Sequence, residues 1–259
     1  MQPATRRVLG QTRQSELLTY LRTNKIGHVA ELSEVLGASE STIRRDLDDL
    51  QQRGLVERVH GGASITDSGI EAALPARART ATDQKRRIGQ AAAGLVDEGS
   101  TVLISGGTTT EAILPHLGGF QSLTVVTNGV QLAAGCAEYP NIQVLVLGGE
   151  LRRASMSLLG GLVSEALGQL QVDRVLMGAF GVDPLGGITG ANLLETQTDR
   201  ALLAAADDVV ILADSSKFFQ RGPVRIADTS EITTLVTDLD APADVVSAFE
   251  AEGVEVVTC

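Results

Sequence analysis

Residues 102–113 read VLISGGTTTEAI, a short apolar run followed by two glycines, three threonines and the start of a helical stretch. The apolar run is typical of a buried strand, and the glycines and threonines are typical of a turn. Backbone N–H groups in such a turn, together with the N-terminus of the next helix, attract an anion. The stretch therefore predicts a strand–loop–helix unit whose loop binds an anion, with these candidate ligands: Gly106, Gly107, Thr108, Thr109 and Thr110.

The same alternation of apolar runs and helical stretches continues through the rest of the chain. The runs are TVLIS, LTVVTN, IQVLVLGG, RVLMGAF, DVVILAD, TTLVTD and, near the C-terminus, VEVV. Strands that alternate with helices indicate parallel strands joined by crossover helices. We therefore expect residues 82–259 to form an α/β domain around a sheet with helices on both faces.

Polar or glycine-rich groups follow most of these runs directly. Besides the 105–110 loop, they are Thr127-Asn128, Gly148-Gly149, Gly181-Val182-Asp183 and Asp214-Ser215-Ser216-Lys217. Ligands of open α/β sheets bind beyond the carboxyl ends of the strands, so we expect one crevice with many N–H and O–H donors and the Lys217 ammonium. Neither GxxxxGK[ST] nor a strand–GxGxxG–helix fingerprint occurs, which favours a small phosphorylated metabolite over a nucleotide.

The first 64 residues have a different pattern, that of three short amphipathic helices. Apolar residues recur at helical spacing after Arg13, after Gly27 and after Ser39. Gly37 is suited to end the second helix in the left-handed conformation, and Ser39 is suited to cap the third. Helix, tight turn and helix is the layout of DNA-reading motifs, and LVERVHGGA at 55–63 indicates a wing. We predict a winged helix-turn-helix over residues 8–64 and a linker over 65–81.

The third helix turns Ile43, Leu47 and Leu50 inward and leaves a polar face outward. Arginine binds guanine with two hydrogen bonds, and serine or threonine reaches bases or phosphates. The alternative is a solvated helix face, since three aspartates follow the arginine pair closely. The predicted DNA contacts are Ser39, Ser41, Thr42, Arg44 and Arg45 of this helix, with Arg58 and His60 of the wing touching the DNA backbone.

Charge is distributed unevenly along the chain. The net charge is −11, but residues 1–64 carry nine Lys or Arg against eight Asp or Glu, and the remainder carries twelve against twenty-four. The N-terminal segment is therefore near neutral and the body is acidic. The two cysteines and three histidines show no metal-ligand spacing, and no run approaches the ~18 apolar residues of a membrane span. We expect a cytoplasmic protein with no metal, no cofactor and no membrane contact.

Both parts of the chain resemble one family. The N-terminal part is similar to the signature of the DeoR family of bacterial transcriptional regulators in Arg13, Leu17, Leu21, Ser39, Thr42, Ile43, Arg44, Arg45, Asp46 and Leu47. The rest is similar to the DeoR-type sensor domain in Lys85, Ile88, GGTTT, VVTN, LGG, Gly160, the 173–179 strand, GVD, GIT, Glu195 and DSSKF. The resemblance implies a structural role for Asp46, in a pair with an arginine or a backbone group.

The resemblance also implies a fold and a function. The fold is that of ribose 5-phosphate isomerase and glucosamine 6-phosphate deaminase, and the family's domain binds a sugar phosphate that changes the DNA affinity of the winged helix. We therefore expect a homo-oligomeric DNA-binding regulator, a dimer or tetramer that represses a sugar-catabolism operon on double-stranded operator DNA. Its phosphorylated sugar effector is expected to contact the 105–110 loop, Asn128, Asp183, Glu195 and Lys217.

Two other functions remain open at this point. The first is a sugar-phosphate isomerase or deaminase with an attached DNA-binding module, in which Asp183, Glu195 and Lys217 act as acid, base and phosphate ligand. Fold alone does not carry chemistry, and the DNA reader argues against turnover. The second is a larger domain that only oligomerises. A structural reading of the same carboxylates has Asp183 capping a turn before Gly186 and Glu195 on a solvated helix.

Two positions depart from the family pattern. Ser105 stands where the family usually has an aspartate before the Gly-Thr-Thr loop. Asp199 stands where the family often has a lysine, four residues after the Glu195 position. The first change removes a carboxylate near the loop and the second reverses a charge. Both affect which sugar is bound more than whether a phosphate is bound.

Overall fold

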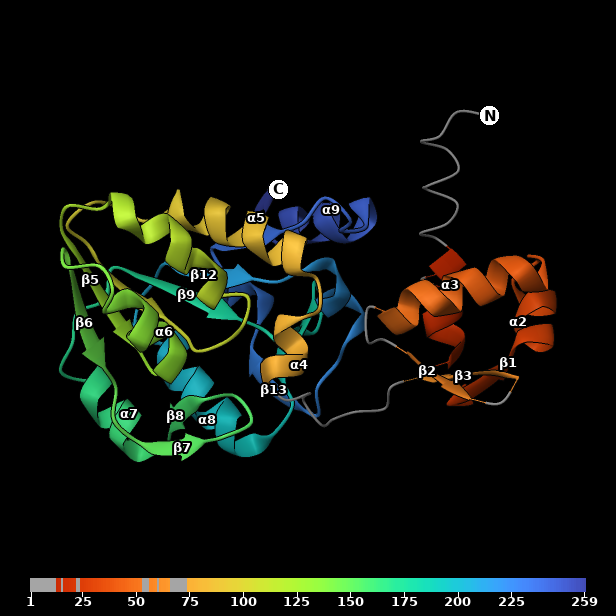
Figure 1. Ribbon diagram of the computed structural model, residues 1–259, viewed down its shortest axis with the longest axis horizontal. Helices are drawn as coiled ribbons and strands as arrows, with labels where there is room; N and C mark the ends of the chain where they lie inside the picture. The colour runs from red at the N-terminus through yellow and green to blue at the C-terminus, as the bar shows by residue number, and fades with distance from the viewer. Residues whose placement is uncertain (1–12, 15, 22–23, 53–55, 60, 66–73) are drawn as a thin grey trace. The chain divides into compact units, whose positions relative to one another are not determined.

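The computed structural model describes residues 13–14, 16–21, 24–52, 56–59, 61–65 and 74–259. The chain divides between residues 68 and 69 into two compact units, which are drawn with their elements in Figure 1. Within the described residues, no helix is long and apolar enough to cross a membrane.

The first unit is a small helical bundle with a three-stranded antiparallel sheet. Residues 13–14 and 16–21 are helical, and the other elements are β1 (Ile26–His28), α2 (Val29–Val35), α3 (Glu40–Gln52), β2 (Val56–Val59) and β3 (Gly62–Ile65). The sheet order is β1-β3-β2. The predicted helices and wing hairpin are confirmed. Between the first two predicted helices lies β1, a strand of three residues that is too short to show a period of two.

Local chemistry sets the end of α2 and the start of α3 as the sequence predicts. Gly37 has a φ of +60°, the left-handed conformation that terminates α2. The Ser39 hydroxyl oxygen accepts the Thr42 N–H at 3.3 Å and so caps α3. Asp46 is buried and accepts two hydrogen bonds from the Arg13 guanidinium, with Nε to Oδ2 at 2.5 Å. The structural role predicted for Asp46 is confirmed, because this ion pair ties α3 to the first helix.

The second unit is built on a seven-stranded sheet in which every neighbouring pair is parallel. Its order is β15-β14-β12-β9-β4-β5-β6. The strands are β4 (Thr101–Ile104), β5 (Leu123–Thr127), β6 (Ile142–Val146), β9 (Arg174–Gly178), β12 (Val209–Leu212), β14 (Thr234–Thr237) and β15 (Glu255–Thr258). They are the seven predicted runs. The strand that precedes the 105–110 loop lies between two others, so neighbouring loops flank that loop on both sides.

Helices cover both faces of this sheet, as predicted for the fold class (Figure 1). One core lies under α5 (Thr82–Ala93), η1 (Glu111–Gly119) and α6 (Val130–Cys136). The other lies under α7 (Gly161–Leu167) and α8 (Leu193–Leu203) and takes in Phe249 of α9 (Ala243–Ala251). The predicted helix after the loop is the 3-10 helix η1, which contains Pro115. Proline has no N–H for the hydrogen bond that would continue an α-helix.

Short elements complete the second unit at the carboxyl edge of the sheet. They are the hairpin β7 (Glu150–Arg152) and β8 (Ser157–Leu159), the antiparallel sheet β10 (Gly181–Asp183), β11 (Gly187–Gly190) and β13 (Val224–Ala227), the 3-10 helices η2 (Ser215–Phe219) and η3 (Thr229–Glu231), and α4 (Leu74–Ala78). Helix α4 lies within the stretch expected to be linker, and its Leu74 is buried and donates its N–H to Ala154 O at 3.0 Å.

A close backbone contact joins α5 to η1. A Cβ placed on Gly89 would lie 2.2 Å from the carbonyl oxygen of Ala112, a distance that real side chains do not reach. Gly89 and Lys85 lie one helical turn apart on the buried face of α5. The absence of a side chain at Gly89 therefore lets α5 lie directly on η1 and sets the position of the 105–110 loop relative to α5.

We predict that Gly89→Ala destabilises the second unit by at least about 2 kcal/mol, because the new methyl group meets backbone that cannot move without shifting η1. The measurement is urea unfolding followed by circular dichroism. Gly119→Ala is the matched control, since a Cβ there meets nothing within 4 Å. Equal stability of the two variants would show that the close approach of α5 to η1 is not required.

Candidate functional site

The 105–110 loop is held to strand β9 by Ser105. The Ser105 N–H donates to Leu176 O at 3.0 Å, and its hydroxyl oxygen accepts the Gly178 N–H at 3.2 Å. Within the loop, the Thr110 hydroxyl lies 2.7 Å from Ser105 O and 2.8 Å from Gly107 O. Ser105, one of the two departures from the family pattern, thus uses its hydroxyl to fix the loop to the neighbouring strand.

Asn128 connects the loop to strand β5 and to the β7–β8 hairpin. Its side-chain oxygen accepts the Gly106 N–H at 3.0 Å, and its amide group donates to Leu158 O at 3.2 Å. A Cβ on Gly106 would lie 2.9 Å from the Gly129 Cα and 2.5 Å from the Ser157 hydroxyl. The predicted residues Gly106 and Asn128 are therefore in direct contact, and three segments that are distant in sequence meet at this point.

The middle of the loop carries polar groups with no protein partner. The N–H groups of Gly107, Thr108 and Thr109 donate to no acceptor among the described residues, and the Thr108 and Thr109 hydroxyls are likewise without one. Thr109 is 7% exposed. Consecutive backbone N–H groups in a strand-to-helix turn form sites for anions, so these donors are candidates for binding a ligand that accepts their hydrogen bonds.

Four charged groups in or beside three elements, α4, η1 and η2, lie near Lys85, which is 6% exposed on α5. Burial lowers the pKa of Lys85 to about 8; the nearby Asp214 carboxylate opposes this shift, and Lys217 and Arg77 reinforce it. Burial raises the pKa of Glu111, the residue directly after the loop, to about 7, against the effect of Arg77 and Lys85. Three cations therefore gather near the end of the loop. One of them, Lys85, carries its charge in a buried position where it has lost most of its hydration.

Lys217 lies on η2, which follows strand β12. The Asp214 side chain accepts the Ser216 N–H at 3.1 Å, and the Lys217 N–H donates to Asp214 O at 2.9 Å. The Lys217 side chain is half-buried, and its ammonium has no hydrogen-bond or ion-pair partner within the part of the chain described. The structure thus brings Lys217 near Lys85, and the described residues leave its ammonium available to a ligand.

Glu195 reaches the loop only through intermediate residues. Its carboxylate accepts the Ser155 hydroxyl at 2.7 Å and the Asn192 amide at 2.7 Å, and it lies 3.0 Å from the Arg152 guanidinium. Ser155 belongs to the turn that carries Ser157, which lies against Gly106. The Glu195 side chain is mostly buried. The alternative reading of Glu195 as a residue on a solvated helix therefore does not hold, and its role in effector binding stays a prediction.

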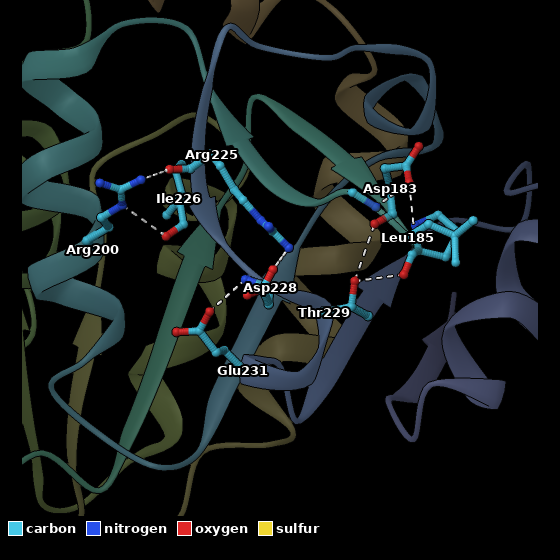
Figure 2. Close-up of polar contacts among 10 residues, drawn as sticks. Asp183, Leu185, Arg200, Arg225, Ile226, Asp228, Thr229 and Glu231 are labelled. Atoms are coloured by element: carbon cyan, nitrogen blue, oxygen red, sulfur yellow. Dashed lines mark hydrogen bonds and ion pairs between the residues drawn. The ribbon is translucent and has the colours of Figure 1, made fainter.

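Asp183 turns its carboxylate back onto the β10–β11 turn (Figure 2). One carboxylate oxygen accepts the Leu185 N–H at 2.9 Å and the Gly186 N–H at 2.6 Å. The Thr229 hydroxyl closes the other side of the turn by donating to Pro184 O at 2.8 Å. These contacts match the turn-capping role, and among the described residues none of them joins Asp183 to the 105–110 loop.

The predicted DNA contacts form a polar surface at the start of α3. The Ser39 hydroxyl lies 3.0 Å from that of Ser41 and 2.8 Å from that of Thr42. Arg44 pairs with Glu40 one turn earlier at 3.2 Å, whereas the exposed Arg45 forms no ion pair with the described residues. On β2, Arg58 lies 3.8 Å from Asp48. His60 lies outside the described residues.

Two family models match the chain, one over each unit. The model of the DeoR-like helix-turn-helix domain matches residues 13–69, and that of the DeoR C-terminal sensor domain matches residues 80–239. The chain belongs to the DeoR family. Residues 105–110, Lys85 and Lys217 therefore lie in a DeoR sensor domain, and α3 is part of a DeoR-like helix-turn-helix.

Relatives of nearly full length are named as regulators of transcription. The chain is 31% identical to a protein of Escherichia coli named as a transcriptional repressor of the aga operon, over 97% of this chain and 95% of that protein. It is 30% identical to the glycerol-3-phosphate regulon repressor of the same species, over 88% and 91%. The predicted DNA-binding transcriptional regulator is confirmed, and the isomerase or deaminase alternative is not favoured.

A likeness among solved structures is much weaker. Ribose 5-phosphate isomerase A from Methanocaldococcus jannaschii matches with a TM-score of 0.39 and 18% identity over 53% of this chain and 55% of that one. At that level it supports no inference about the chemistry of this DeoR-family protein.

Sequence reasoning did not assign roles to the charged residues around Lys85. Lys85 entered only as part of the family pattern, and Arg77 fell in the expected linker. One signal was present for Lys85: it shares a helical face with the apolar Ile88 and Ala92, at positions that are buried in α5. A lysine on the core face of a helix indicates a cation with a specific role. No comparable signal identified Glu111, because its burial depends on α4 and α5.

We predict that Glu111→Gln stabilises this DeoR-family protein at about pH 8 by about 1 to 3 kcal/mol and has little effect near pH 4.5. The folded protein holds the Glu111 proton more tightly than the unfolded chain, so this stabilisation is complete below pH 4.5 and is lost as the pH rises to about 7. Glutamine stays neutral at every pH. Urea unfolding at the two pH values measures the effect.

Glu138→Gln, at an exposed position, is the control for the general effect of removing a negative charge. An equal gain for Glu111→Gln at both pH values, or a gain matched by Glu138→Gln, would contradict the raised pKa of Glu111.

Proposed function

We propose that this protein represses transcription of an operon for sugar or polyol use, and that a phosphorylated sugar or polyol binds the 105–110 loop and changes its affinity for the operator. The observation that carries the proposal is the set of unpartnered N–H and hydroxyl groups at Gly107, Thr108 and Thr109, close to the Lys85 and Lys217 ammonium groups. Donors and cations of this kind complement a phosphate group.

Electrostatics support an anionic ligand in particular. Protonated Lys85 is destabilised by burial and by the positive charges of Lys217 and Arg77. A phosphate dianion would reverse that balance, because it lies within reach of the same cations and favours their charged forms. A neutral sugar would bring no negative charge to offset these cations. We infer that the phosphate contributes most of the binding energy, and we propose that Asn128, Asp183 and Glu195 contribute to recognition of the sugar.

The DNA-binding part of the proposal rests on α3. Its first two turns present the Ser41 and Arg45 side chains to solvent, while Ile43 and Leu47 are fully buried. This arrangement is the one by which a recognition helix places its N-terminal residues against base edges. Arg45 is the strongest candidate for base reading, because Arg44 is paired with Glu40.

We further propose a dimer or tetramer whose paired DNA-binding domains occupy repeated half-sites. The domain limits that we propose are residues 8–64 for DNA binding, 65–81 for the linker and 82–259 for the sensor. Two-fold symmetric proteins match the two-fold symmetry of their operators. A coupling free energy of ~1 to 3 kcal/mol between effector and operator, about 5- to 150-fold in affinity, is enough for repression and release.

The central experiment is a gel shift with DNA from upstream of this protein's own gene, titrated with a panel of sugar and polyol phosphates. A thermal-shift screen of the same panel measures binding independently, since a ligand at a hundred times its Kd adds about 2.7 kcal/mol to the free energy of unfolding. Failure of every phosphate to raise the melting temperature would refute the sensor role. Consumption of a bound phosphate would instead revive the isomerase or deaminase alternative.

We predict that Arg45→Ala weakens operator binding by ~1 to 3 kcal/mol and relaxes base preference at one position of each half-site. Fluorescence anisotropy with operator variants measures both effects. Arg86→Ala, at an exposed position on α5 of the sensor, is the charge-matched control and is expected to bind the operator normally. Unchanged operator affinity in Arg45→Ala would remove this residue from the DNA interface.

Lys217→Ala is expected to retain operator binding and to lose most of its response to the effector. The substitution removes an ammonium that has no partner among the described residues, so the fold should persist. Gel shifts with and without the effector, at equal protein concentration, provide the measurement. If operator binding collapses even without effector, Lys217 is a structural residue.

A further inference from the structure

Helix α4 is the first described element of the chain after the DNA-binding unit, and hydrogen bonds near its two ends link it to the sensor. Residues 66–73, which precede it, lie outside the described part of the chain. α4 has five residues, too few to be stable alone, so its position depends on what it touches. Its first residue, Leu74, is buried and donates its N–H to Ala154 O in the β7–β8 turn.

The last turn of α4 is held by Lys85. The Lys85 ammonium donates to the carbonyl oxygen of Arg77 at 2.6 Å, across eight residues of chain. The same carbonyl accepts the Thr80 N–H at 3.2 Å, which turns the chain toward α5. Ala81, between the two helices, has a φ of +53°, so a conformation that is unfavourable for alanine is maintained at this corner. The bond from Lys85 is thus part of what keeps the corner closed.

Lys85 also faces the 105–110 loop. The contact of Gly89 with Ala112 places α5 directly on η1, and Lys85 lies one helical turn before Gly89 on the same face. Glu111, the residue after the loop, and Lys217 of η2 both lie close enough to Lys85 to influence its charge. One ammonium therefore stands between the end of α4 and the loop that has unpartnered donors.

We propose that Lys85 couples the sensor to the DNA-binding unit: an anionic effector at the 105–110 loop draws the Lys85 ammonium away from the Arg77 carbonyl and so loosens α4. The coupling rests on the proposed effector site. A hydrogen bond from an ammonium to a phosphate oxygen is about twice as strong as one between neutral groups, so the phosphate is the stronger acceptor. Because α4 leads back along the chain toward the wing, its loosening changes the restraint on the DNA-binding unit.

The charge state of Lys85 supports the same coupling. Burial lowers the pKa of Lys85 to about 8, so the ammonium is held in a poorly solvated position near neutral pH. The groups that face it are Asp214 and Lys217 near η2, Arg77 of α4 and Glu111 of η1. A phosphate near the loop would add the negative charge that this set lacks. The effector would therefore attract Lys85, the residue that restrains α4, directly.

The first arm of the test needs no effector. Hydrogen–deuterium exchange of the peptide spanning residues 74–81 is measured for the full-length protein and for Lys85→Met, which keeps the length of the side chain and removes the donor. We expect α4 to exchange about threefold to tenfold faster, the factor that corresponds to one hydrogen bond. Arg86→Met, the neighbouring exposed position on the same helix, is the matched control and should exchange as the unchanged protein does.

Exchange in strand β9 reports whether the variants are folded. If Lys85→Met fails to fold, Lys85→Gln, which keeps a neutral donor on a shorter side chain, replaces it with the same expectation. Equal α4 exchange in the unchanged protein and in the folded Lys85 variant would overturn the proposal, because Lys85 would then not restrain α4.

The second arm uses the unchanged protein with inorganic phosphate, and sodium chloride at matched ionic strength is the control. A raised melting temperature together with faster α4 exchange supports the coupling. A raised melting temperature with unchanged or slower α4 exchange overturns the coupling and leaves the effector site standing. If neither inorganic phosphate nor any phosphate of the panel raises the melting temperature, the effector site itself is refuted and the coupling with it.

Discussion

Parallel pairing of β4 with β5 on one side and β9 on the other is the constraint on which the sensor depends. Because parallel strands end at one edge of a sheet, the loop after β4 meets the residues that follow both neighbours. Asn128 then takes the Gly106 N–H, and Ser105 takes that of Gly178. These bonds fix the rim of the loop, and no acceptor in the described part of the chain takes its middle N–H groups, so a rigid frame surrounds an incomplete set of hydrogen bonds.

The charges near the loop indicate what completes that set. Lys85 and Glu111 are both buried far enough to shift toward their neutral forms, and Arg77 and Lys217 add positive charge near them. Such an arrangement is costly for folding alone, since buried charges lose their hydration. It is the arrangement expected of a protein that binds an anion part of the time. The unfavourable charge arrangement lowers the free energy of unfolding of the sensor without ligand. Ligand binding would relieve it and so raise that free energy.

In the DNA-binding unit, hydrogen bonds and an ion pair likewise fix the position of one element, the helix α3. Ser39 caps α3 with its hydroxyl and lies within hydrogen-bonding distance of the Ser41 and Thr42 hydroxyls on the polar face. Asp46 lies among the exposed charged residues of α3 but is itself buried in a pair with Arg13. The helix predicted to meet DNA is therefore held from its inner side by an ion pair and at its first turn by a cap, and its exposed Arg45 forms no ion pair with the described residues.

The sequence alone determined the elements that depend on local pattern: seven parallel strands, three N-terminal helices, the Ser39 cap, and the position of the loop after its strand. These follow from the period of apolar residues and from turn chemistry, which act within a few residues. Only the tertiary structure decided how side chains far apart are used. It turned Asp183 onto its own turn, joined Glu195 to the β7–β8 hairpin, and bonded Lys85 to the Arg77 carbonyl near Glu111. Burial and hydrogen-bond partners are properties of the packed chain, because they depend on which segments meet after folding.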